Sequence, residues 1–387
     1  MKKLLIINTK YRKFGGEDSN IQDEINLLSK KFKIDFLEYD NNERISIFDI
    51  LSLFTNGNYK SNKKLKEHIK AFSPDYAYVH NLWFKGNTGI FKILNENNIK
   101  TFHKIHNYRL SCSTTFSLKK HLNDKSKCYG CNMQIKNLQF FNKYFTNSYI
   151  KSLFLIFFSK KSINMIKKYK INLLVLNTFH KNYLIDFGLD PHQVKVFYNP
   201  INFKSIKYSN YNPKSNYVLY GGVVSKEKGV SELIKAWDEA KVKNLVLKIA
   251  GDSNDLILEE IGIENKTIEV LGHIPHNELL DLIQNARAVV TATKLLEGQP
   301  RLLCEASSFG IPSIYPSFGG MDEYFPENYP LSFEQYNYKN LAEKIKKLED
   351  SELLAKKSIE VQSFIEKALN VEKLLDEFEN ITDSSLS

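Results

Sequence analysis

The chain has 387 residues, more than an ordinary single core accommodates, so its length predicts about two domains. An apolar fraction of 42% and a charged fraction of 25% are those of a soluble globular protein. No apolar run approaches the roughly 20 residues of a membrane-spanning helix, and the run after Met1-Lys2-Lys3 is too short for a secretory signal. Four cysteines without an export signal favour a reducing compartment, so we expect a cytoplasmic protein.

The first predicted element is a buried strand over residues 4–8, followed by Gly15-Gly16 and a helical pattern through Ile21, Ile25 and Leu28. A strand, a Gly-Gly turn and a helix bring backbone amides and a helix N-terminus against an anion. Similar Gly-Gly turns follow apolar runs at 217–222 and 314–320. None of them is GxGxxG with an acidic residue at dinucleotide spacing, so a Rossmann dehydrogenase is not expected.

Strand and helix patterns alternate along the chain, which predicts an α/β protein with two doubly wound parallel sheets. The polar, turn-rich stretch 201–216 interrupts the alternation and is the predicted linker. We expect one domain over 1–195, a second over 196–365, and a C-terminal helix and tail over 366–387 that packs back toward the first domain. Further predicted strands lie at 34–37, 76–79, 101–105, 173–176, 194–198, 245–250 and 267–271.

The net charge of +10 is concentrated in one segment of the first domain. Residues 111–170 contain twelve lysines, no arginine and one acidic residue, Asp124, so this window alone carries +11. A solvated helix with aromatic core residues explains part of the pattern. The density of lysine and aromatic side chains nevertheless favours an anionic membrane or a pyrophosphate. Nucleic acid is not expected, because the window has no arginine and no RNA-binding motif.

Two carboxylates mark the most informative stretch of the second domain. A buried strand at 288–292 leads into a loop that carries Glu297, and Glu305 lies on the second turn of the helix that follows. Pro300 suits the first helical position and Gly310 the left-handed position after the last turn. Two carboxylates near one helix N-terminus repel each other unless a hydroxyl-rich or cationic ligand lies between them. A ligand site is therefore expected here.

This ordered set of motifs resembles the glycosyltransferases of the GT-B fold, specifically family 4, over nearly the whole chain. The resemblance implies two Rossmann-like domains facing across a cleft, with the acceptor mainly on domain 1–195 and the nucleotide-sugar on domain 196–365. It also implies retention of anomeric configuration, with no metal or other cofactor required. The motifs that carry it are Gly15-Gly16-Glu17, His80-Asn81, His106-Asn107-Tyr108-Arg109-Leu110, Asn199-Pro200-Ile201, Lys226-Glu227-Lys228-Gly229-Val230, Ile249-Ala250-Gly251-Asp252, Leu271-Gly272 and the E-x7-E pair Glu297 and Glu305.

The resemblance assigns Glu305 to the ribose hydroxyls of the donor, since a carboxylate accepts two hydrogen bonds from a diol. Glu297 would face the transferred sugar and stabilise a developing oxocarbenium charge, and Lys228 would neutralise the diphosphate. His106 would act beside Glu297 in catalysis, donating a hydrogen bond near the sugar. The remaining implied residues are Gly15, Gly16, Arg301 and Leu302 on the donor side, and His80 and Asn107 on the acceptor side.

The implied reaction is a front-face displacement in which the leaving phosphate helps to remove the acceptor proton, so positioning and electrostatics carry most of the rate. One residue departs from the family pattern. Val223 stands where the family usually has an arginine that clamps the diphosphate. Lys226 or Arg301 would have to replace that charge.

Simpler explanations compete for each residue. Glu297 and Glu305 would then be solvated acids at a helix N-terminus, Lys228 a surface lysine, and His80 and His106 packed core histidines. Cys112, Cys128 and Cys131 form C-x15-C-x2-C, which could hold a structural zinc with His103 or His121 as the fourth ligand. Reduced packing cysteines explain the spacing better, because only three sulfurs are present.

The sequence therefore predicts a retaining, metal-independent glycosyltransferase on the inner face of the membrane. It would transfer a sugar from a nucleotide-sugar to a lipid-linked or surface-polysaccharide acceptor. Two alternatives remain: a catalytically silent GT-B scaffold of a polysaccharide-assembly complex, and a peripheral protein that binds anionic lipid.

Overall fold

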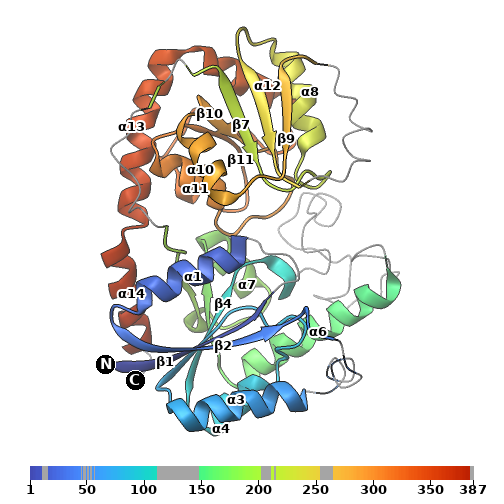
Figure 1. Cartoon of the computed structure of the whole chain (residues 1–387), viewed down its shortest axis with the longest axis vertical. Helices are drawn as coiled ribbons and strands as arrows, with labels where there is room; N and C mark the ends of the chain where they lie inside the picture. Colours follow the sequence, from blue (N-terminus) through green and yellow to red (C-terminus); the bar gives the residue numbers. More distant parts are fainter. Residues whose placement is uncertain are drawn as a thin grey trace. The chain divides into compact units, whose positions relative to one another are not determined.

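The computed structural model describes residues 1–10, 16–44, 46, 49, 52, 55, 57–110, 148–201, 211–212, 215–252 and 265–383, without the side chains of 16–18. The chain forms two compact units, Met1–Pro200 with Val371–Ser387 and Ile201–Asn370 (Figure 1). The sequence placed these boundaries near 195 and 365, and most of its predicted linker lies outside the described residues.

The first unit is built on a six-stranded sheet of order β2-β1-β3-β4-β5-β6, in which every neighbouring pair is parallel. Its strands are β1 (Lys2–Lys10), β2 (Phe32–Asp40), β3 (Tyr76–Val79), β4 (Lys100–Ile105), β5 (Asn172–Val175) and β6 (Val194–Val196). Its helices are α1 (Gly16–Leu28), α3 (Tyr59–Phe72), α4 (Ile90–Glu96), α6 (Tyr149–Lys168), α7 (Thr178–Asp186) and α14 (Val371–Asp383), with short 3-10 turns at Tyr108–Leu110 and Pro191–Gln193.

Strand alternation explains why this sheet has two apolar faces. Leu4 and Ile6 of β1 pack in one core cluster with α1 and α14, whereas Leu5 and Ile7 pack in another with α3, α4, α6 and α7. The strands are therefore continuous apolar runs, which is how they are recognised in the sequence. Every second side chain of β3 and β4 points toward α1. Residues of these two strands and of α1 therefore meet in the site described below.

Helix α14 belongs to the first unit although it lies at the other end of the sequence. Phe378 is fully buried in the core cluster of α1, in edge contact with Phe32 and Tyr78. At the rim, Lys31 pairs with Asp376 at 2.8 Å and Glu379 at 2.7 Å. The helix lies alongside α1 (Figure 1) and extends to Asp383.

The second unit has a parallel sheet of order β12-β11-β10-β7-β8-β9. Its strands are β7 (Tyr217–Gly221), β8 (Val246–Ala250), β9 (Ile268–Gly272), β10 (Ala288–Val290), β11 (Ser313–Ser317) and β12 (Ser332–Glu334). Its helices are α8 (Val230–Ala240), α10 (His276–Gln284), α11 (Arg301–Ser308), α12 (Tyr338–Lys346) and α13 (Ser351–Ala368), with 3-10 turns at Met321–Tyr324 and Lys347–Glu349. Two parallel α/β sheets confirm the predicted fold class.

The end residues of α11 test the sequence rules directly. Gly310 has φ +71°, the left-handed conformation expected after the last turn. Pro300 is the residue before the helix, with ψ 89°, so the prediction that it occupies the first helical position is wrong by one residue. In the described part of the chain, no helix has the length and apolar character needed to cross a bilayer.

Candidate functional site

Loops at the carboxyl ends of β7, β8 and β10 form a candidate site within the second unit. These loops touch through backbone. A Cβ on Gly251 would lie 1.9 Å from the carbonyl oxygen of Gly222, and a Cβ on Gly229 would lie 2.0 Å from that of Ala292. Gly229 has φ +70° and precedes α8, so it is the residue that lets the β7 loop turn into the helix against β10. The carboxyl end of a parallel sheet is where ligands of open α/β folds bind.

Lys228 and Glu297 meet at this edge. The Lys228 ammonium lies 2.5 Å from Glu297 Oε1, and the Thr293 hydroxyl also lies within hydrogen-bond reach, at 3.3 Å. Both charged side chains are part-exposed, at 31% and 23%. Burial and the Glu297 carboxylate together raise the pKa of the neighbouring Tyr220. The sequence had named Lys228 and Glu297 as donor-facing residues, and the structure brings them into direct contact.

Glu305 lies behind this pair on α11 and is nearly fully buried. Its Oε1 atom accepts from Arg301 Nε at 2.7 Å, one helical turn away, and lies 2.9 Å from His276 Nε2. A carboxylate has about four acceptor positions, and among the described residues the partners of Glu305 lie at Oε1, so Oε2 can accept from a ligand. His276 is the first residue of α10. Sequence reasoning missed it because nothing in the spacing of a lone histidine signals a contact made by tertiary packing.

The other donor-side candidates differ in surroundings. The Leu302 side chain lies against Gly221 at the end of β7, where a Cβ would be 2.9 Å from one of its methyl groups. Val223 is 57% exposed, so an apolar side chain occupies an open position where the family pattern has a cation. Of the two replacements considered for that charge, Arg301 contacts Glu305, and Lys226 is exposed on the loop before α8.

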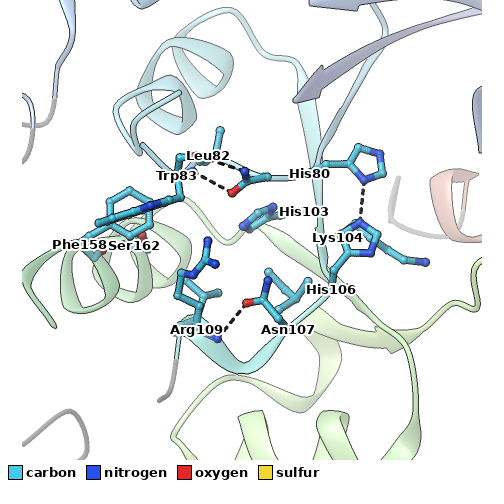
Figure 2. Close-up of a pocket in the computed structure, with 13 residues that line it drawn as sticks. His80, Leu82, Trp83, His103, Lys104, His106, Asn107, Arg109, Phe158 and Ser162 are labelled. Carbon is cyan, nitrogen blue, oxygen red and sulfur yellow. Dashed lines mark hydrogen bonds between the residues drawn. The ribbon is translucent and has the colours of Figure 1, made fainter. Parts of the chain in front are cut away.

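Two histidines dominate a second candidate site, which lies within the first unit. His80 follows β3 and His106 follows β4. Strand alternation places both on the face that α1 covers, together with Lys104. His80 Nδ1 lies 3.0 Å from His106 Nε2 (Figure 2). His80 Nε2 lies 3.4 Å from Glu24 Oε2 of α1, whose other oxygen lies 3.2 Å from Lys104 Nζ.

Burial controls the charges of this cluster. It holds the pKa of His80 and of His106 well below the ordinary value of 6.5, and the positive charge of Lys104 acts in the same direction. Burial also lowers the pKa of Lys104 to about 8, although Glu24 opposes the shift. The pKa of Glu24 is raised by burial, and Lys104 limits that rise. At neutral pH the two imidazoles are therefore uncharged.

A small pocket of about 50 Å³ opens beside the histidines. Its walls combine aromatic and hydrogen-bonding groups. The Trp83 ring packs edge-on against Phe158, and the Arg109 guanidinium lies 5.9 Å from the centre of the Trp83 ring. The Asn107 side chain accepts from the Arg109 backbone amide at 3.0 Å (Figure 2). An aromatic wall with polar side chains around it suits a saccharide or another polyhydroxyl ligand.

Some predicted residues cannot be placed. Gly15, the three cysteines Cys112, Cys128 and Cys131, and residues 111–147 of the basic window lie outside the described residues. Gly16 is the first residue of α1. The structure thus brings together Lys228 with Glu297, Arg301 with Glu305, and His80 with His106. It adds His276, Glu24 and Lys104, which the sequence reasoning did not select.

Glu24 and Lys104 carried a sequence signal that was overlooked. Glu24 interrupts the apolar stripe of α1 between Ile21 and Leu27, and Lys104 interrupts the apolar face of β4 after Phe102. A charged residue in a core-facing position requires a buried partner.

Comparison with known proteins places the chain in a structural class. No curated protein matches it in sequence. Residues 202–368 match the family model described as "Glycosyl transferases group 1". These residues fall within the second unit.

Solved structures resemble the chain over nearly its full length. Anabaena Alr3699/HepE, solved in complex with UDP and glucose, is 14% identical with a TM-score of 0.68, over 99% of this chain and 100% of that one. The lipopolysaccharide outer core galactosyltransferase WaaB is 18% identical with a TM-score of 0.64, over 99% and 100%. Sucrose-phosphate synthase from Thermosynechococcus elongatus is 15% identical with a TM-score of 0.70, over 98% of each chain. The chain therefore has the GT-B fold of glycosyltransferases.

Proposed function

We propose that this protein is a glycosyltransferase that moves a sugar from a nucleotide-sugar donor to a hydroxyl of a glycan acceptor. The observation that carries the proposal is the contact of Lys228 with Glu297 beside the buried Glu305, at the carboxyl edge of the second sheet. The match to the glycosyl transferases group 1 model over this unit supports it. So does the similar fold of Alr3699/HepE, which was solved with UDP-glucose and with UDP and glucose.

Each group has a distinct task in the proposed reaction. The free oxygen of Glu305 accepts from a ribose hydroxyl, while Arg301 and His276 hold the carboxylate in place. Lys228 leaves Glu297 and pairs with the diphosphate, whose charge grows as the glycosidic bond breaks. Glu297 is then released to face the transferred sugar. The diphosphate thus replaces Glu297 as the partner of Lys228, and Glu297 is compensated only by the positive charge that develops on the sugar in the transition state.

The finer features of the reaction follow from the family resemblance and the chemistry of these groups. Transfer proceeds with retention by front-face displacement, and the leaving phosphate takes the acceptor proton. No metal or other cofactor is required, because Lys228 and the amino end of α8 supply the positive potential. Measuring the anomeric configuration of the product by proton NMR, and turnover with and without a chelator, tests these two statements.

We also propose a lipid-linked or surface-polysaccharide acceptor, reached from the inner, cytoplasmic face of an anionic membrane. Four large apolar side chains of α6 are exposed along one stripe: Tyr149 at 50%, Ile150 at 67%, Leu153 at 43% and Phe157 at 48%. Lys160 is exposed on the same side of the helix. A stripe of this kind inserts at headgroup depth while the lysines interact with anionic lipid.

Vesicle sedimentation tests the membrane proposal. The full chain should pellet with vesicles that contain anionic lipid at low salt and remain in the supernatant with neutral vesicles. Replacing Leu153 and Phe157 by Ser should abolish pelleting. The matched change Ile359→Ser, at a 73% exposed position of α13, should not. Equal pelleting by both variants contradicts attachment through α6.

Donor turnover tests the central proposal. Nucleoside diphosphate release is measured over a panel of nucleotide-sugars, with Glu297→Gln as the inactive comparison. In parallel, thermal unfolding should respond to the true donor, since a ligand at 100 times its Kd adds about 2.7 kcal/mol of stability. The proposal is contradicted if no nucleotide-sugar stabilises the chain and none releases nucleoside diphosphate.

The exposed Val223 supports one competing function, a GT-B scaffold that binds nucleotide without transferring sugar. The same assay separates the two. A scaffold is stabilised by a nucleotide-sugar, yet it releases no nucleoside diphosphate from any donor.

A further inference from the structure

Helix α1 carries a carboxylate in the centre of its buried stripe. Ile21, Leu27 and Leu28 pack into the core of the first unit, and Glu24 is fully buried among them. Its two oxygens lie 3.2 Å from Lys104 Nζ and 3.4 Å from His80 Nε2. A buried carboxylate is strongly unfavourable unless it is paired, and the pairing here is to the histidine cluster beside the pocket.

The environment of Lys104 favours the ionised form of this carboxylate. The Lys104 nitrogen lies 3.2 Å from Glu24 Oε1 as an ion pair, donates to the carbonyl oxygen of Phe197, and lies 4.3 Å from the centre of the Phe197 ring. These contacts suit an ammonium group, which has only protons to offer and no lone pair. The cation on Lys104 then requires Glu24 as its counter-ion.

An ionised Glu24 imposes a direction on the hydrogen bonds that follow. A carboxylate attracts a proton and repels a lone pair, so Glu24, 3.4 Å away, favours the proton on His80 Nε2 through an electrostatic contact that lies outside hydrogen-bond geometry. A neutral imidazole has one N–H, so His80 Nδ1 accepts from His106 Nε2, 3.0 Å away. His106 Nδ1 is then left with a lone pair. This atom is buried and makes no hydrogen bond within the described part of the chain.

We propose that Glu24 and His80 are positioning residues that fix the tautomer of His106, so that His106 Nδ1 accepts a hydrogen bond from a hydroxyl of the bound sugar or acceptor. The polarity is opposite to that expected from the sequence, where His106 donates. Only the identity of the hydroxyl rests on the proposed sugar transfer. The other titratable groups around the pair are Asp23 on α1, Tyr78 on β3, and His103 and Lys104 on β4.

Replacing Glu24 by Gln should reverse the direction of the proton donation between His80 and His106. Lys104 still requires an acceptor, so the oxygen of the new side-chain amide faces it and the amide N–H₂ faces His80. His80 then accepts at Nε2 and donates from Nδ1, which leaves His106 with its proton on Nδ1. Tyr78→Phe is the control, because it removes a hydroxyl that interacts with Glu24 but leaves the carboxylate, and therefore the direction, in place.

The tautomers are read by long-range proton–nitrogen NMR of histidine-labelled full-length protein, with the His106 signals assigned from their loss in His106→Gln. We expect the Nε2–H tautomer of His106 in the wild type and in Tyr78→Phe, and the Nδ1–H tautomer in Glu24→Gln. An Nδ1–H tautomer in the wild type overturns the proposal, and this measurement stands even if Glu24→Gln does not fold. An unchanged tautomer in folded Glu24→Gln also overturns it.

Kinetics provide the second readout. Glu24→Gln should lower kcat about 10- to 100-fold, as loss of an orienting partner does, with little change in donor KM, because the proposed nucleotide contacts lie in the second unit. A kcat equal to that of Tyr78→Phe overturns the role of the pair in transfer. If no variant and no wild-type protein turns over any nucleotide-sugar, the proposed function fails, while the NMR result still decides the tautomer.

Discussion

The Lys228 ammonium lies 2.5 Å from Glu297 Oε1, and these residues come from different loops of the same sheet edge. The side chains are about a quarter to a third exposed, so the pair is accessible to an incoming anion. An exposed ion pair contributes little to folding, typically about 0–1 kcal/mol. The pair can therefore open for a ligand at little cost in folding stability.

Replacing Lys228 by Met should remove the cation that compensates the diphosphate. We expect kcat/KM to fall by about 100-fold or more, the usual effect of losing one group that stabilises transition-state charge. Nucleoside diphosphate release measures the effect. Lys294→Met is the matched control, because Lys294 also lies 2.5 Å from a glutamate, Glu232, with similar exposure. Equal losses in the two variants would show that Lys228 has no special role.

Replacing Glu305 by Gln tests the proposed ribose contact. The amide oxygen can still accept from Arg301 and His276, so the fold of α11 should persist. The amide nitrogen then replaces the acceptor that faces the ligand. We expect nucleotide affinity to fall by about 10- to 100-fold, since a hydrogen bond to a charged group contributes about 1.5–3 kcal/mol. Calorimetric titration with UDP and other nucleoside diphosphates measures it.

The control for this change is Glu278→Gln, on the exposed face of α10. It removes the same charge from the same unit without touching α11. A Glu305→Gln protein that binds nucleotide as tightly as Glu278→Gln would exclude Glu305 as the ribose ligand.

The strands and strand-end loops of this fold were easier to predict from the sequence than the contacts within the site. The strands were recognisable because buried parallel strands are continuous apolar runs, as in β3 over Tyr76–Val79. The strand-end loops were recognisable because Gly229 and Gly251 have positive φ and lie against neighbouring backbone.

The pairings within the site were not recognisable in the same way. His276 reaches Glu305, and Glu24 reaches both Lys104 and His80, only through packing of elements far apart in sequence. The pattern of α1 indicated that Glu24 is buried, but it did not indicate which group would neutralise it. Likewise, Asn107 was expected to face the acceptor, and its side chain accepts from the Arg109 amide.

Gly229 and Gly272 form a matched pair for testing the loop that carries Lys228. Their φ values are +70° and +69°, so alanine costs about 1–2 kcal/mol of left-handed backbone strain at either position. Among the described residues beyond its chain neighbours, a Cβ at Gly272 meets no atom within 4 Å, whereas at Gly229 it meets the Ala292 carbonyl oxygen at 2.0 Å.

Gly229→Ala must therefore move the loop or the strand end, and Gly272→Ala need not. We expect Gly229→Ala to be the less stable variant in urea denaturation and to lose nucleotide binding, because Lys228 and Glu297 are displaced. Gly272→Ala should retain binding. Equal unfolding free energies in the two variants would mean that the close approach of Gly229 to Ala292 does not contribute to the stability of the fold.

The last prediction concerns stability in acid. Burial lowers the pKa of His103 to about 4 and that of His180 to about 3, against 6.5 for an unfolded chain. Between pH 6.5 and pH 4, unfolded His103 binds a proton that the folded chain excludes. Acid therefore favours unfolding, and stability is lost as the pH falls through this window. The expected slope is up to about 1.4 kcal/mol per pH unit for each such histidine.

His103→Gln isolates one of these contributions. The glutamine amide can still donate to the Val79 carbonyl oxygen, which His103 Nδ1 contacts at 3.0 Å, but it cannot titrate. Urea denaturation at pH 7, 6 and 5 should therefore show a shallower loss of stability in His103→Gln than in the wild type. His192→Gln, at an exposed position in the same unit, should retain the wild-type slope. If stability falls with pH in His103→Gln as steeply as in the wild type, His103 is protonated in the folded chain. That result would contradict the burial of this β4 residue against Phe91 of α4.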